Sequence, residues 1–76
     1  SRPESLNVLN SREAEIAALI TDRLSNREIA ERLFLSEGTV KQYVNQIYSK
    51  LMINGDTRTK RKQLAELISS INKGLT

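Results

Sequence analysis

Two helix-start signals separated by a very short connection constrain the fold of this chain most. Ser25 and Glu28 have the spacing of a capping box, in which each side chain accepts a hydrogen bond from the backbone amide of the other residue. Ser36 is suited to a second N-cap, and only three residues lie between the expected helices 26–33 and 37–53. A short helix, a tight turn and a longer helix are typical of a helix-turn-helix.

Two further helices are expected on either side of this pair. Asn10 and Glu13 also have capping-box spacing, at the start of a helix expected over 11–22. The Asn-Gly pair at 54–55 tolerates positive φ and is expected to end the third helix. Asp56 can then cap a fourth helix that runs to about residue 72.

The apolar pattern predicts an all-α fold. Apolar residues recur at helical spacing, and no stretch alternates with period two for long enough to predict a strand. We expect a four-helix domain with a tri-helical core over residues 9–76, preceded by a linker or tag remnant over 1–8.

The composition argues against an enzyme. The 76 residues include no Cys and no His, which excludes disulfides, thiolate or imidazole zinc sites and Cys-His or Ser-His nucleophilic pairs. There is no glycine-rich phosphate loop, and a chain this short has little room for a substrate pocket. We expect no catalytic residues, metal, cofactor or small-molecule ligand. The apolar runs are too short to span a bilayer and no signal peptide opens the chain, so a cytoplasmic location is expected.

Positive charge is concentrated in the second half of the chain. Residues 1–40 hold five basic and seven acidic side chains, whereas residues 41–76 hold seven basic and two acidic ones. This asymmetry is expected for a polyanion-binding face, although a solvated basic surface would give the same counts.

The outward face of the helix expected over 37–53 has the residue types that read DNA bases. Its apolar stripe consists of Val40, Val44, Ile47 and Leu51. If that stripe faces the core, the opposite side presents Gly38, Lys41, Gln42, Asn45 and Ser49. Lys donates to guanine, and Gln and Asn pair with adenine, so Lys41, Gln42 and Asn45 are the candidates for base reading. An ordinary solvated polar face is the alternative.

Phosphate contacts are expected around this face, because they set the register of a DNA-binding protein. The candidates are Asn26, Thr39, Tyr43, Ser49, Lys50, Arg58 and Lys60. Helix amino termini bind anions, so Ser25 and Ser36 could also contact a phosphate, with plain capping as their alternative role. The alternative for Tyr43 is that its ring rests on the core. Basic side chains cluster over 58–62, near the start of the fourth helix, where positive charge is unfavourable to the helix dipole. A nearby phosphate backbone or plain solvation would offset this energetic cost.

The succession of motifs resembles one known family. The chain contains, in order, Leu9-Asn10-Ser11-Arg12-Glu13, Ser25-Asn26-Arg27-Glu28-Ile29-Ala30, Leu35-Ser36-Glu37-Gly38-Thr39-Val40-Lys41 and Lys50-Leu51. This run strongly resembles the LuxR-type (GerE-like) helix-turn-helix domain, and the ordered set is far more specific than any one motif.

The resemblance implies a four-helix domain at the carboxyl end of a bacterial transcription regulator, often a two-component response regulator with a phosphorylated receiver domain. The third helix is then the recognition helix in the major groove, and the fourth pairs with its symmetry mate. The apolar residues expected at that dimer contact are Leu64, Leu67, Ile68 and Ile71. Two features depart from the family pattern: Tyr43 stands where many members have His, and the link over 53–59 is longer and more basic than usual.

We therefore expect a homodimer that binds double-stranded DNA sequence-specifically, each copy reading a half-site of an inverted repeat. A stand-alone regulator without a sensor is compatible with the same sequence. The alternative function is a helix-docking protein-interaction module without specific DNA binding. A large exposed apolar patch, with DNA binding that is absent or insensitive to salt, would distinguish that module.

Overall fold

Four helices pack around one hydrophobic core in the described part of the chain. A computed structural model describes residues 8–75, with side chains over 8–70. Its helices are α2 (Ser11–Thr21), α3 (Asn26–Leu33), α4 (Glu37–Lys50) and α5 (Thr57–Leu75), and the described part of the chain has no strand. The predicted all-α class is confirmed. The linker expected over 1–8 lies, apart from Val8, outside the described residues.

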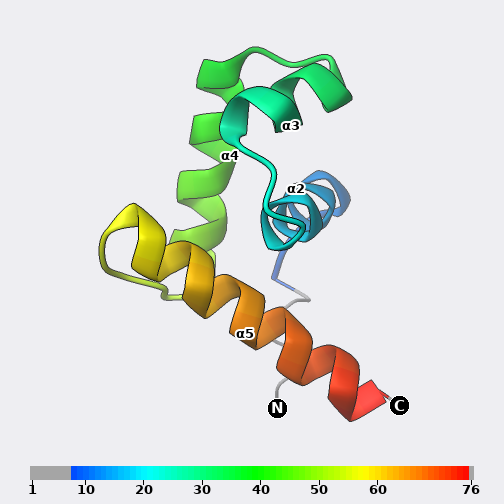
Figure 1. Cartoon of the computed structure of the whole chain (residues 1–76), viewed down its shortest axis with the longest axis vertical. Coiled ribbons are helices and arrows are strands. Elements are labelled where there is room, and N and C mark those ends of the chain that lie inside the picture. The colour runs from blue at the N-terminus through cyan, green and yellow to red at the C-terminus, as the bar shows by residue number, and fades with distance from the viewer. Residues whose placement is uncertain (1–7, 76) are drawn as a thin grey trace.

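The helix α2 contacts each of the other three helices. This helix packs against α3, α4 and α5, and α3 also packs against α4. Figure 1 shows α3 and α5 near the two ends of α4, with α2 seen almost end-on between them. The turn between α3 and α4 and the link into α5 therefore lie at opposite ends of α4.

Each helix begins at the cap that the sequence predicts. The accepting side chains bond the amide three residues ahead at 2.8 Å for Asn10, 3.1 Å for Ser25, 3.1 Å for Ser36 and 2.8 Å for Asp56. The caps at Asn10 and Ser25 are complete capping boxes, closed by the carboxylates of Glu13 and Glu28. These starts depend only on residues within one turn, which is why sequence spacing predicts them.

The helix ends differ from the expectation. We expected the third helix to reach residue 53 and end at Asn54-Gly55, but α4 ends at Lys50. Met52 takes the left-handed conformation with φ 57°, and the amide of Ile53 bonds the carbonyl of Tyr48 at 2.8 Å. This Schellman turn directs Ile53 into the core, and burial of that side chain stabilises the early stop.

Two other helices end in the same way, without glycine. Arg23 follows α2 with φ 70°, and Phe34 follows α3 with φ 58°. In each case the next residue, Leu24 or Leu35, bonds back to a carbonyl five residues earlier and packs against the core. Arg23 and Phe34 thus occupy the left-handed position that glycine usually takes, and the apolar residue that follows each of them packs against the core.

The core confirms the predicted orientation of the third helix. Val40, Val44 and Ile47 are buried and pack with side chains of α2 and α3, including the fully buried Ile16 and Ile29. One expectation for the fourth helix is wrong. Leu64 was placed at a dimer contact, but its side chain is 0% exposed within the domain's own core and is not free to touch a second copy.

Candidate nucleic-acid interface

The side of α4 opposite the core is open to solvent. Lys41, Gln42 and Asn45 are exposed, as expected for residues that read bases. Near the start of the helix, a Cβ at Gly38 would meet no atom within 4 Å apart from those of its chain neighbours and the adjacent helix backbone. The only carboxylate of α4 is that of Glu37 in its first turn. This face is therefore uncovered, free of negative charge beyond its start, and suited to approach a polyanion.

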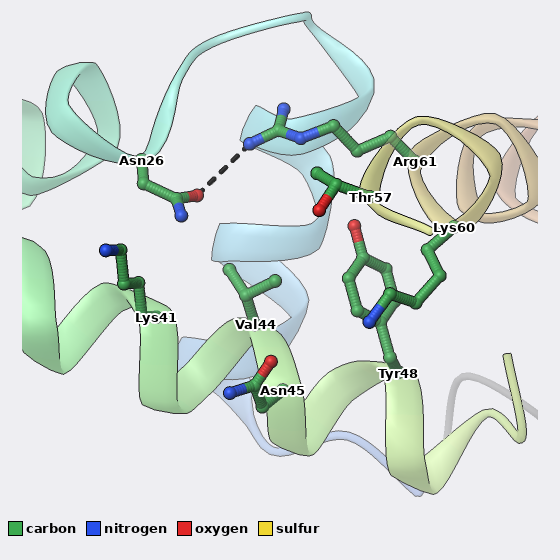
Figure 2. A pocket seen from close by; sticks show the side chains of 8 residues that line it. All are labelled: Asn26, Lys41, Val44, Asn45, Tyr48, Thr57, Lys60 and Arg61. Carbon is green, nitrogen blue, oxygen red and sulfur yellow. Dashed lines mark hydrogen bonds between the residues drawn. The ribbon is translucent and has the colours of Figure 1, made fainter. Parts of the chain in front are cut away.

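A pocket of about 210 Å³ lies beside this face, between α4 and the starts of α3 and α5. Figure 2 shows the eight side chains that line it. They are Asn26, Lys41, Val44, Asn45, Tyr48, Thr57, Lys60 and Arg61. Three are cations and none carries a carboxylate. The fold thus gathers two candidates for base reading, Lys41 and Asn45, with two candidates for phosphate binding, Asn26 and Lys60.

Arg61 connects α5 to the start of α3 at the rim of this pocket. Its guanidinium donates to the backbone oxygen of Leu24 at 2.9 Å and to Oδ1 of Asn26 at 3.1 Å. Because a guanidinium has no acceptor, these contacts fix the oxygen side of the Asn26 amide toward Arg61. The NH₂ group of Asn26 is left for another acceptor.

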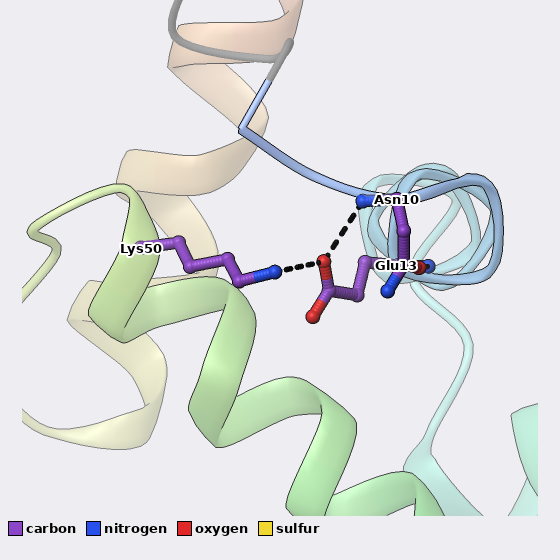
Figure 3. Close-up of polar contacts among 3 residues, drawn as sticks. All are labelled: Asn10, Glu13 and Lys50. Atoms are coloured by element: carbon purple, nitrogen blue, oxygen red, sulfur yellow. Dashed lines mark hydrogen bonds and ion pairs between the residues drawn. The ribbon is translucent and has the colours of Figure 1, made fainter.

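Lys50 has a different partner from the one expected. We expected it to contact a DNA phosphate, but its ammonium bonds Oε1 of Glu13 at 2.7 Å (Figure 3). The Glu13 side chain is 0% exposed, so the ammonium compensates a buried carboxylate. The hydrogen bond from Lys50, together with that from the Asn10 amide, holds the pKa of Glu13 below its ordinary value although burial opposes this. The structure therefore gives Lys50 a role inside the domain.

The remaining candidates for phosphate binding lie in varied surroundings. Ser49 and Arg58 are exposed. The Thr39 hydroxyl accepts from that of Ser36 at 2.8 Å and belongs to the cap of α4. Tyr43 is half-buried and packs against the core, which agrees with the alternative in which its ring lies on the core boundary.

Comparisons with known proteins agree with this geometry. The family described as bacterial regulatory proteins of the luxR family matches residues 7–62, more than half of the chain. The chain belongs to the LuxR family. It is a DNA-binding helix-turn-helix domain of a transcription regulator and is not an enzyme.

Several curated proteins resemble this LuxR-type domain. Transcriptional regulatory protein LnrK of Bacillus subtilis (strain 168) is 44% identical over 57 residues, 75% of this chain and 26% of that protein. Transcriptional regulatory protein DegU of Brevibacillus brevis is 45% identical over 53 residues, 70% of this chain and 22% of that protein. The DNA-binding transcriptional activator DevR/DosR of Mycobacterium tuberculosis (strain ATCC 25618 / H37Rv) is 38% identical over 50 residues, 66% of this chain and 23% of that protein. The chain thus matches about a quarter of the length of these relatives, and no solved structure matches it.

Sequence reasoning missed Tyr48 in this LuxR-type domain. Its side chain is only 4% exposed, and the ammonium of Lys60 lies 5.0 Å from the centre of its ring. Burial raises the pKa of the Tyr48 hydroxyl. Tyr48 lies four residues after Val44, on the same stripe of α4, so helical spacing was the signal that could have found it.

The described part of the LuxR-type domain has two further properties. Among residues 8–75, no helix combines the length and apolar character needed to span a membrane. Within the same residues, no three acidic, His or Cys side chains gather as a metal site would require.

Proposed function

We propose that this domain binds double-stranded DNA sequence-specifically, with α4 in the major groove as its recognition helix. Lys41, Gln42 and Asn45 read base edges, and Asn26 and Lys60 contact the phosphates that flank them. The observation that carries this proposal is the orientation of α4, whose valine and isoleucine stripe is buried while these three polar side chains are exposed. A major groove admits one α-helix, and lysine and amide side chains match the donors and acceptors displayed there.

The proposed setting is the output domain of a bacterial response regulator in the cytoplasm. The family resemblance supports a preceding receiver domain, because LuxR-type domains often follow one. The match to about a quarter of LnrK and DegU is compatible with further domains in the complete protein.

The proposed assembly is a homodimer on an inverted repeat, with contacts along α5. Leu67 and Ile68 are half-buried within one copy, which leaves part of each side chain available to a second copy. The side chain of Ile71, expected at the same contact, lies outside the described residues. Two copies supply the affinity and specificity that one half-site lacks.

A binding selection on random duplexes tests base reading directly. The wild type is compared with Lys41→Ala, Gln42→Ala and Asn45→Ala, and each change is expected to relax the preference at one or two base pairs. Lys60→Gln is the control, because loss of a phosphate contact weakens binding to every sequence alike. Unchanged preferences in all three alanine variants would contradict the proposal and move base reading to another surface.

A further inference from the structure

We propose that the pocket between α4 and the start of α5 holds one phosphate of the DNA backbone, and that the hydroxyl of Tyr48 is a donor to it. This inference rests on the proposed function, since it assumes that α4 lies in the major groove. It adds Tyr48 and Thr57 to the DNA-binding residues and gives Lys60 a defined site in place of a general electrostatic role.

The hydroxyl of Tyr48 lacks a partner in the free domain. The residue is 96% buried, since only 4% of it is exposed, and its oxygen has no hydrogen bond among the described residues. Buried polar groups are nearly always hydrogen-bonded, because desolvation without a partner costs about 1–3 kcal/mol. Figure 2 shows this oxygen directed toward Thr57 and the pocket. An acceptor that arrives from outside would remove the cost.

The lining of the pocket supplies donors and positive charge. Lys60 reaches over the Tyr48 ring from α5, and the hydroxyl of Thr57 lies at the first residue of that helix. The NH₂ group of Asn26, left unused by Arg61, is on the opposite side. The amides in the first turn of a helix also favour an anion. The carboxylate of Asp56 caps this helix start, where it accepts from the amide of Thr59 at 2.8 Å.

The size and position of the pocket favour a backbone phosphate. Its volume of about 210 Å³ exceeds the roughly 30 Å³ that one water occupies in the liquid. It opens next to Lys41 and Asn45 on the base-reading side of α4. The phosphates of both strands border a helix that lies in the major groove, so one strand passes on the α5 side of α4. A phosphate on that strand would meet neutral and charged donors together.

The first test is Tyr48→Phe, which removes only the hydroxyl. The free variant is expected to melt at the wild-type temperature or above it, because an unpaired buried oxygen is lost. Its affinity for every duplex is expected to fall roughly tenfold with an unchanged salt slope, since the lost donor is neutral. Lys60→Gln should lower that slope by about one unit. Lys62→Gln is the matched control, because Lys62 is exposed and lies two residues on, on the other side of α5, and it should keep the wild-type slope.

The second test identifies the phosphate. In a duplex taken from the selection, each phosphate is replaced in turn by an uncharged methylphosphonate. Wild type should lose more affinity than Tyr48→Phe at one phosphate, because the variant has already lost one of the donors to it, while both respond alike elsewhere. Wild-type affinity of Tyr48→Phe, or a loss that leaves its response to every methylphosphonate unchanged, would overturn the pocket assignment alone. Absence of salt-dependent binding by the wild type would instead overturn the proposed function, and this inference with it.

Discussion

The ammonium of Lys50 lies 2.7 Å from Oε1 of Glu13 and joins the last turn of α4 to the first turn of α2 (Figure 3). Glu13 has two roles at once, because the same oxygen accepts the Asn10 amide at 2.9 Å and completes the capping box of α2. Its second oxygen is buried without a partner among the described residues. The carboxylate therefore depends on Lys50 for its compensation.

Removal of Lys50 is expected to destabilise the domain. Lys50→Met leaves the buried carboxylate unpaired, and we expect the free energy of unfolding to fall by roughly 1–3 kcal/mol in urea titrations. This is less than the ~3–5 kcal/mol of a fully buried pair, because solvent screens a partly exposed lysine. In a Glu13→Gln background, Lys50→Met should lower the free energy of unfolding much less, because the glutamine amide still caps the helix but carries no charge. Equal costs in both backgrounds would show that the pair is not coupled.

Stability is expected to fall in acid through Glu13. Its pKa in the folded domain lies below the ordinary value of 4.5, chiefly through the hydrogen bond from Lys50. A lowered carboxyl pKa contributes stability above pH 4.5, and that stability is lost as pH falls through the folded-state value. Melting temperatures from pH 7 to pH 3 should therefore decline less steeply for Glu13→Gln than for wild type. The pKa values of the Glu28 and Asp56 carboxyl groups, which also bond backbone amides at helix starts, are lowered as well. The Glu13→Gln variant should therefore keep some acid sensitivity. An equally steep decline in the variant would refute this assignment.

The two lysines Lys50 and Lys60 are expected to differ in DNA binding. Lys50 is held by Glu13, whereas Lys60 borders the pocket beside the base-reading face. The slope of log affinity against log salt concentration should drop by about one unit in Lys60→Met and stay at the wild-type value in Lys50→Met. Fluorescence anisotropy at a temperature where both variants are folded measures this. A reduced slope in Lys50→Met would instead support the phosphate contact that the sequence predicts for Lys50.

Substitutions of two leucines of α5 are expected to have different effects, one on folding and the other on assembly. Leu64 is fully buried, so Leu64→Ala should cost about 2–5 kcal/mol of unfolding free energy. Leu67 is only half-buried, and Leu67→Ala should cost less than that while weakening self-association and binding to an inverted repeat. Sedimentation equilibrium and binding to single and paired half-sites measure these effects. Wild-type assembly of the Leu67 variant would place the dimer contact elsewhere.

Glycine at position 34 is expected to stabilise the domain. Phe34 is 95% exposed and has a left-handed backbone, which costs a side chain about 1–2 kcal/mol. Phe34→Gly removes that cost but adds backbone entropy to the unfolded chain, for a net gain of roughly 0.5–1 kcal/mol. Thermal melting by circular dichroism measures the gain. Phe34→Ala, which removes the ring but keeps the Cβ, should show no gain in stability. A similar gain in both variants would mean that the ring, and not the left-handed backbone, is the cause.

The sequence by itself determined where the helices begin and which side of α4 faces outward. The caps at Asn10, Ser25, Ser36 and Asp56 involve hydrogen bonds over three residues, so their residue types and spacing suffice to predict them. The apolar stripe of α4 follows from the helical repeat alone.

Only the tertiary structure decided the partner of Lys50, the burial of Leu64 and the early end of α4. Lys50 and Glu13 are 37 residues apart, and they meet because α2 and α4 cross. Leu64 and Leu67 share one apolar pattern, and only the position of α5 on the core separates a buried leucine from a half-exposed one. The α4 helix stops at Lys50, where the turn at Met52 brings the side chain of Ile53 into the core. Such contacts depend on how helices lie against one another, which local hydrogen bonds and periodicity do not specify.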